Sequence, residues 1–220
     1  AVPRGAVMGL RGPNGAGKTT LMHLLTGLVP PEAGRLRVLG LEPWRERVPL
    51  QRRMASVPET PQIYPWITVR AFGDFCRRNF PGWDEAYVAG KLAEYGGPAD
   101  RRFGRLSRGQ QGLVSLLAAL GRPGEVVLLD DPTLGLDVLA RRQLYRTIVE
   151  ELAEREVTIL FATHLPAEVE GVLTHAAFLR DGRIGLQGTV EERKRQAAAD
   201  GAVPTLEDLA VRHLGGDHVA

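Results

Sequence analysis

Short apolar runs alternate along the chain with longer stretches in which apolar residues recur at helical spacing. The runs at 6–10, 126–129 and 157–162 are continuous enough to predict buried strands, and shorter strands are expected at 35–39 and 55–57. Strands that alternate with helices in this way predict an α/β fold built on a mostly parallel sheet.

The end of this pattern predicts one antiparallel element. Residues 176–179 and 183–186 flank Asp181-Gly182, a dipeptide typical of a two-residue hairpin turn. We therefore expect a β-hairpin here, in addition to the mostly parallel strands.

Helical spacing dominates the remaining segments. The pattern favours a single domain over 1–220, with a helical lobe at about 68–120 inserted in the core and a helical tail at 190–220. Pro81-Gly82 marks a break inside the lobe. The predicted helices cover 19–28, 44–53, 68–97, 107–120 and 138–154.

The composition is that of an ordinary globular protein and gives no support to several classes of function. The net charge of +2 gives no argument for binding nucleic acid or an anionic membrane. The single cysteine, Cys76, excludes an internal disulfide. No apolar run approaches the roughly 18 residues of a membrane helix, so we expect any membrane role to come through a partner.

A glycine-rich segment follows the first apolar run. Residues 12–19, GPNGAGKT, match the G-x-x-x-x-G-K-[ST] pattern at every fixed position. In such a loop backbone N–H groups surround phosphates at a helix N-terminus, while the lysine reaches the outer phosphates and the hydroxyl ligates Mg²⁺. We therefore predict a nucleoside triphosphate site that is formed by Asn14, Gly15, Ala16, Gly17, Lys18, Thr19 and Thr20.

Two aspartates end the apolar run at 126–129. Asp130 follows a buried strand, where a second Mg²⁺ ligand is expected to act through water. The alternative is an aspartate pair that caps a strand end before Pro132, as is common at turns. The phosphate loop upstream favours the metal site.

A second motif, LSRGQ at 106–110, opens the predicted helix at 107–120. Ser107 supplies an N-cap hydroxyl, and Gly109 permits a phosphate to approach backbone N–H groups closely. Taken alone, the motif is also explained by an ordinary helix cap.

Together the two motifs resemble the nucleotide-binding domain of an ATP-binding cassette (ABC) protein. The resemblance implies a P-loop NTPase fold, ATP and Mg²⁺ as ligands, and two copies that meet head to tail over two ATP molecules. In that arrangement Ser107, Gly109 and Gln110 of one copy face the γ-phosphate that the other copy holds.

The resemblance also assigns catalytic roles. Asp131 stands where the family carries glutamate, the general base for the attacking water; the side chain is one methylene shorter, which predicts slow hydrolysis. His164 matches the histidine that hydrogen-bonds the γ-phosphate, while the other histidines, His23 among them, match nothing. Asp137 resembles a residue of the loop that crosses the dimer contact, or it caps the following helix.

Two further positions depart from the family pattern. Glu59 stands where a glutamine touches Mg²⁺ and the transport partner, and a carboxylate ligates Mg²⁺ at least as well as an amide. Gln62 is a rival candidate with a less fitting spacing. Arg108 replaces a glycine and either adds a cation to the shared site or faces solvent, which we favour.

Aromatic residues follow Glu59 closely. Tyr64, Trp66 and Phe72 either pack in the core, the more common role, or line a groove for a helix of a partner. In the family, the aromatic that stacks on adenine lies upstream of the phosphate loop. We therefore expect that the first strands of the domain are missing, and the preference for ATP rests on the resemblance.

Three function classes remain open. The segments 58–69 and 205–209 resemble the separate ATPase subunits of bacterial exporters. This implies a second copy or a homologous ATPase subunit, an integral-membrane transport subunit, and a place at the cytoplasmic face of the membrane. A soluble relative acting on DNA or ribosomes is disfavoured, because such relatives carry coiled coils, zinc-binding cysteines or two cassettes. A slow regulatory nucleotide switch stays open because of Asp131.

Overall fold

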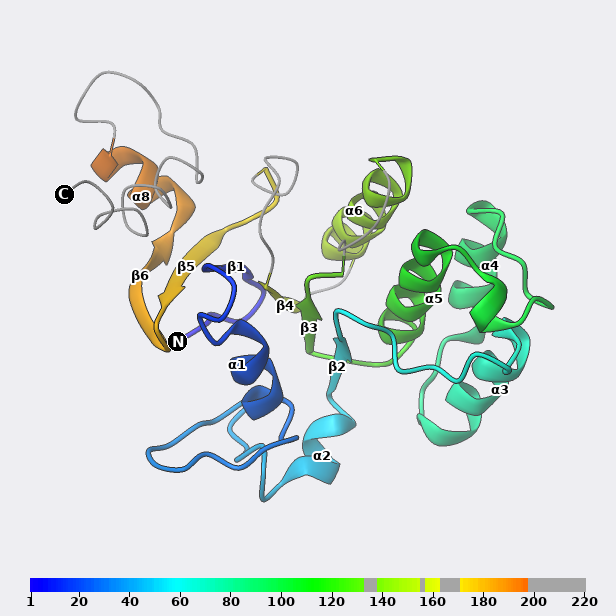
Figure 1. Ribbon diagram of the computed structural model, residues 1–220, viewed down its shortest axis with the longest axis horizontal. Helices are drawn as coiled ribbons and strands as arrows, with labels where there is room; N and C mark the ends of the chain where they lie inside the picture. The colour runs from blue at the N-terminus through cyan, green and yellow to red at the C-terminus, as the bar shows by residue number, and fades with distance from the viewer. Residues whose placement is uncertain (133–137, 155–156, 163–170, 198–220) are drawn as a thin grey trace.

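A six-stranded sheet forms the centre of the computed structural model, which describes residues 1–132, 138–154, 157–162 and 171–197 (Figure 1). The strands lie side by side in the order β2-β3-β4-β1-β5-β6. Their bounds are Val7–Arg11 for β1, Met54–Val57 for β2, Val126–Asp130 for β3, Thr158–Ala162 for β4, His175–Arg180 for β5 and Arg183–Thr189 for β6.

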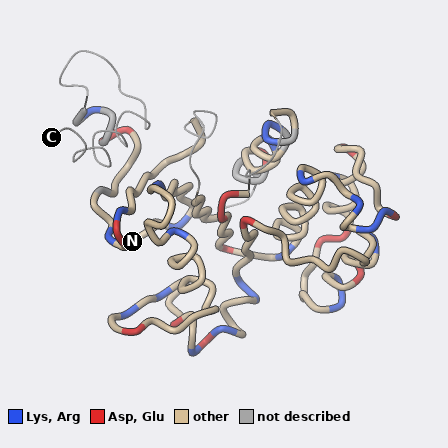
Figure 2. Tube along the Cα trace, in the orientation of Figure 1, with Lys and Arg blue, Asp and Glu red and all other residues tan. Residues whose placement is uncertain are grey.

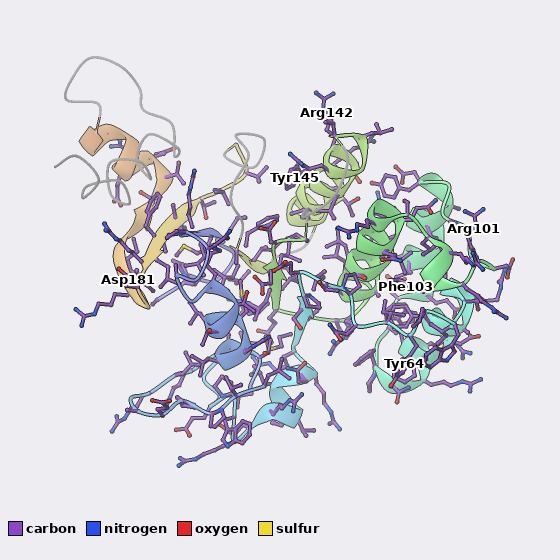
Figure 3. All side chains as sticks on the ribbon, in the orientation of Figure 1. Tyr64, Arg101, Phe103, Arg142, Tyr145 and Asp181 are labelled. Atoms are coloured by element: carbon purple, nitrogen blue, oxygen red, sulfur yellow. The ribbon has the colours of Figure 1, made fainter. Side chains whose placement is uncertain are left out.

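All neighbouring strands are parallel except β5 and β6. These two form the predicted hairpin, and its turn residues Asp181 and Gly182 have φ values of 48° and 73°. Positive φ at both positions suits the right-handed twist of the flanking strands, and Asp181 lies at the tip of the hairpin (Figure 3). The expected α/β fold, with a mostly parallel sheet and an antiparallel element, is confirmed.

Helices cover both faces of the sheet. The side chains of α1 and α2 share a buried cluster with alternate residues of β1, β2 and β3, whereas α5 and α6 pack on the opposite face. The helices are α1 Lys18–Leu25, α2 Arg47–Gln51, α3 Val69–Asn79, α4 Glu85–Glu94, α5 Arg108–Leu120, α6 Val138–Glu154 and α8 Val190–Ala197, with a 3₁₀ turn at Phe103–Arg105.

Helices α3, α4 and α5 gather at one side of the sheet, beyond β2 (Figure 1). They enclose a cluster of their own, which includes Phe103 and Leu117, neither more than 3% exposed. Polar contacts tie this lobe to α6: the Thr147 hydroxyl donates to the Tyr95 hydroxyl at 2.8 Å, and Lys91 lies 2.6 Å from Glu150. The lobe is therefore fixed to the core by α5 and by contacts between α4 and α6.

The predicted strand at 35–39 is wrong. Within the described residues this segment makes only an isolated bridge, between Val38 and Leu41. A strand needs a partner along its length to pair its backbone groups, and no described segment supplies one here. The helix expected at 44–53 is shorter than predicted and consists of α2 alone. No helix in the described ranges is long and apolar enough to cross a membrane.

Candidate functional site

The glycine-rich loop lies between β1 and α1, at the carboxyl edge of the parallel strands. Gly15 and Gly17 adopt φ values of 79° and 102°, which side chains other than glycine rarely tolerate. Gly12 is needed for another reason, because a Cβ there would lie 2.3 Å from the Leu179 carbonyl oxygen in β5. The loop thus presents the first-turn N–H groups of α1, which have no acceptor within the helix.

Lys18 is buried under this loop. Its Nζ donates to the carbonyl oxygens of Gly12 at 2.8 Å and Pro13 at 3.0 Å. Burial lowers the pKa of the ammonium, and the nearby carboxylates of Asp131 and Asp130 oppose that change. An ammonium carries three donors, so the third can reach an anion that the loop holds.

Thr19 and Asp130 meet at the edge between α1 and β3. The Thr19 hydroxyl lies beside the Asp130 carboxylate and opposes the rise of its pKa, whereas Glu59 lies close enough to add to that rise. Burial is the largest cause of that rise. Acidic positions at the ends of β2 and β3 lie side by side in Figure 2. The structure therefore brings together all three residues predicted as metal ligands.

These three side chains fit Mg²⁺. Mg²⁺ sites typically use one or two carboxylates, completed by substrate phosphates and water, rather than a cage of protein ligands. No group of three or more His, Cys, Asp or Glu in the described ranges is arranged to hold a metal ion by itself. Asp130 is only 7% exposed, and a buried carboxylate beside Glu59 is an arrangement that a cation would stabilise.

Asp131 directly follows β3 in an unusual backbone conformation. Its φ is 41°, and its N–H donates to the Ala162 carbonyl at the end of β4 at 2.6 Å. Aspartate is one of the few residues with a side chain that visits the left-handed region readily. The residue is 8% exposed and lies near enough to Lys18 to raise the pKa of the ammonium.

Two predicted site residues, His164 and Asp137, lie outside the described residues. His23, four residues after Thr19 on α1, lies near the site although the sequence pattern assigned it no role. Its charge opposes the rise of the Asp130 pKa, so the imidazole lies near the carboxylate group. The spacing could have indicated this, because residues i and i+4 of a helix share a face and His23 therefore lies on the same face as Thr19.

Helix α5 begins at the second motif. Ser107 Oγ accepts from the Gln110 N–H at 3.2 Å, while Gln110 Oε1 accepts from the Ser107 N–H at 3.1 Å, so a capping box starts the helix. Arg108 is exposed. Because α5 and α1 cover opposite faces of the sheet, the structure does not bring Ser107, Gly109 and Gln110 to the loop of the same chain.

The three aromatics after Glu59 separate in the structure. Tyr64 and Trp66 stack with ring centroids 4.7 Å apart, and they are 66% and 65% exposed. Phe72 packs against the buried cluster of the lobe. Core packing therefore explains Phe72, while the stacked pair, of which Tyr64 is labelled in Figure 3, stays on the surface.

Comparison with known proteins points to one family. A family model described as ABC transporter matches residues 1–134. The chain is 27% identical over 212 residues to the ABC transporter ATP-binding protein YtrB of Bacillus subtilis (strain 168), covering 96% of this chain and 72% of YtrB. It is 31% identical to the SkfA peptide export ATP-binding protein SkfE of the same organism, covering 90% of this chain and 83% of SkfE.

The chain is also 28% identical to the bacitracin transport ATP-binding protein BcrA of Bacillus licheniformis, covering 83% of this chain but only 60% of BcrA. Among solved structures, an ATP-binding subunit of an ABC transporter superposes with a TM-score of 0.85 at 28% identity, covering 96% of this chain and 89% of that one. A dimeric cassette bound to ADP and phosphate, only 20% identical, shares the fold with a TM-score of 0.75 over 86% of this chain and 88% of its own.

The phosphate loop and the sheet order thus occur together with a family model that matches more than half of the sequence. The chain belongs to the ABC transporter family, as a nucleotide-binding domain.

Proposed function

We propose that this chain binds and hydrolyses ATP as the energy-coupling subunit of an exporter, at the cytoplasmic face of the membrane. Two ATPase subunits meet head to tail over ATP, and a separate membrane-spanning partner uses the cycle of closure and separation. The observation that carries this proposal is the convergence of Lys18, Thr19 and Asp130 under the glycine loop.

In this proposal the loop binds the nucleotide first. The N–H groups at the start of α1 and the Lys18 ammonium bind the phosphates, since both present donors to the same space. Mg²⁺, held by Thr19, Asp130 and Glu59, would neutralise phosphate charge. The capped N-terminus of α5 supports the second copy, because its position across the sheet from α1 suits a phosphate held by another chain.

Hydrolysis follows at the end of β3. A water oxygen attacks the γ-phosphorus, the bond to the bridging oxygen of ADP breaks, and Asp131 accepts the proton of the water. The backbone bond from Asp131 to Ala162 holds the carboxylate at the edge of the sheet. His164 and Asp137 are proposed to position the γ-phosphate and to contact the second copy.

Light scattering of the Asp131→Asn variant tests the dimer. The amide cannot take the proton, so the variant should accumulate as a dimer when ATP and Mg²⁺ are added and stay monomeric with ADP. Lys18→Ala, which loses the buried ammonium, serves as the control and should stay monomeric throughout. A monomeric Asp131→Asn protein that still binds ATP would refute the sandwich with Asp131 as its base.

A regulatory nucleotide switch is the second candidate, and Asp131 is the observation that favours it. A base that is one methylene shorter than glutamate lies further from the attacking water, and a displacement of about 1 Å can cost about a hundredfold in rate. In that case the closed dimer itself, rather than its turnover, carries the signal.

A further inference from the structure

The tip of the β5–β6 hairpin lies against the glycine-rich loop between β1 and α1 (Figure 1). In the hairpin turn, the Gly182 N–H donates a hydrogen bond to the Ala16 carbonyl oxygen at 3.0 Å. This bond joins the phosphate loop to a segment that is distant in the sequence and that none of the site motifs includes. The roles assigned to Lys18, Thr19 and Asp130 do not involve it.

The hairpin also packs closely against both ends of the loop. Strand β5 is a parallel neighbour of β1, and their pairing runs up to the first glycine of the loop. A Cβ at Gly12 would lie 2.3 Å from the Leu179 carbonyl oxygen. A Cβ at Gly17 would lie 3.8 Å from the Gly182 Cα and 3.8 Å from the Leu179 Cδ2. The backbone of the loop therefore rests on the hairpin at its first and last glycine.

The hydrogen bond from Gly182 fixes the direction of one peptide unit of the loop. A peptide bond is planar and trans, so the Ala16 carbonyl and the Gly17 N–H point in opposite directions. Because the Ala16 carbonyl points at the hairpin, the Gly17 N–H points away from it. Within the described ranges, no backbone carbonyl accepts a hydrogen bond from this N–H. The Gly17 N–H is thus left for a phosphate, which such loops bind through backbone N–H groups.

The shape of the hairpin turn depends on positive φ angles. Asp181 and Gly182 have φ values of 48° and 73°. A Cβ at Gly182 would meet no atom within 4 Å, so a side chain there is opposed by the backbone angle and not by a clash. A substitution of Gly182 therefore displaces its N–H without placing any atom near the nucleotide.

We propose that Gly182 is a positioning residue for the phosphates: its N–H orients the Gly17 N–H and thereby sets the affinity of the loop for nucleotide. Gly182 does not touch the nucleotide and acts through Ala16. This inference rests on the proposed function, which supplies the nucleotide, and it adds to the phosphate site a residue from the β5–β6 hairpin.

Isothermal titration of Gly182→Ala with ATP and with ADP, both with Mg²⁺, tests this proposal. Alanine disfavours the φ of 73°, so the N–H of residue 182 moves away from the Ala16 carbonyl. Both nucleotides should bind about tenfold more weakly, because both place a phosphate in the loop. Gly182→Asn is the conservative variant and should recover most of the affinity, since asparagine tolerates the left-handed region.

The matched control carries the same substitution at another turn. Gly96, which follows α4, has a φ of 64°, is exposed, and a Cβ there would also meet no atom within 4 Å. It lies in the lobe beyond β2, at the opposite edge of the sheet from β6 (Figure 1). Gly96→Ala should lose a similar amount of thermal stability and keep the affinity of the wild type. Equal losses of affinity in Gly182→Ala and Gly96→Ala would overturn the proposal.

Steady-state kinetics gives a readout that a loss of stability does not produce. The Gly17 N–H binds phosphate before and during the reaction, so Gly182→Ala should raise KM for ATP about tenfold and leave kcat within about twofold. Partial unfolding would instead lower kcat and leave KM unchanged, because fewer molecules would be active. That second pattern in Gly182→Ala would also overturn the proposal.

Lys18→Ala in the same titrations separates this inference from the proposed function. The variant loses the buried ammonium and should bind both nucleotides poorly. A wild-type chain that does not bind ATP, or that binds it equally well after Lys18→Ala, refutes the proposed function. A wild-type chain that binds ATP through Lys18, with Gly182→Ala binding it equally well, refutes only the role of Gly182.

Discussion

The Thr19 hydroxyl at the start of α1 lies beside the Asp130 carboxylate at the end of β3 and opposes the rise of the pKa that burial causes there. This contact joins two elements that are distant in the sequence, and it places a hydroxyl and a buried carboxylate on one side of the phosphate loop. Both groups are ligands that Mg²⁺ accepts, so the fold brings the two ligands together before the nucleotide arrives.

Replacing Thr19 separates metal binding from nucleotide binding. In Thr19→Ala the hydroxyl is lost, so the affinity for ATP should fall about tenfold or more with Mg²⁺ present and change little in EDTA. Thr19→Ser keeps the hydroxyl and is the matched control. Isothermal titration with and without Mg²⁺ measures both, and an equal loss in EDTA would show that Thr19 acts on the phosphates alone.

The buried, ionised carboxylate of Asp130 should lower the free energy of unfolding of the nucleotide-free chain. Burial raises the pKa of Asp130, so the contribution of this residue to stability is greatest below the unfolded value of about 3.9 and falls as the pH rises through the higher folded pKa. Asp130→Asn removes this fall and should be more stable than the wild type at pH 7, by about 2–4 °C in Tm for each kcal/mol. Thermal unfolding from pH 4 to pH 8 measures the difference between the two proteins, which should shrink toward low pH.

Replacing Asp131 by glutamate should raise the rate of hydrolysis but lower the stability of the fold. Asp131→Glu extends the base and should raise the rate of hydrolysis, by up to about a hundredfold. Glutamate is less tolerant of the φ of 41°, so the same variant should lose about 1 kcal/mol of stability. Steady-state phosphate release and chemical denaturation measure the two effects, and a slower Asp131→Glu enzyme would contradict the assigned role.

The lobe should be coupled to α6 through Tyr95 and Thr147. The Thr147 hydroxyl donates to Tyr95 at 2.8 Å, and Thr147 is fully buried. A double-mutant cycle with Tyr95→Phe and Thr147→Val should give a coupling energy of about 0.5–1.5 kcal/mol. Chemical denaturation measures each free energy of unfolding, and additive effects would show that the contact does not stabilise the lobe.

Local patterns in the sequence predicted much of the fold. The apolar run at 126–129 forms β3, Asp181-Gly182 forms the hairpin turn, and Ser107 caps α5. These features could be predicted because each depends on only a few neighbouring residues. The prediction of a strand at 35–39 was wrong because a strand requires a neighbouring strand to pair with, which a local pattern does not reveal.

Contacts between distant segments could not be predicted from the sequence. Phosphate-loop chemistry indicated Lys18, Thr19 and Asp130, but neither spacing nor periodicity showed that Tyr95 contacts Thr147 or that Arg122 lies over Phe80. These contacts depend on how the lobe packs on the core. The left-handed conformation of Asp131 was likewise not evident, although aspartate is a residue that permits it.

Single-turnover measurements show whether the chain hydrolyses the ATP that it binds and whether Asp131 acts as the base. Excess protein is mixed with labelled ATP and Mg²⁺, and phosphate formation is followed in the wild type, Asp131→Asn and Lys18→Ala. The wild type should hydrolyse its bound ATP, Asp131→Asn should bind ATP but hydrolyse it at least about a hundredfold more slowly, and Lys18→Ala should bind it poorly. Equal and negligible rates in the wild type and Asp131→Asn would contradict the account of this chain as an ATPase.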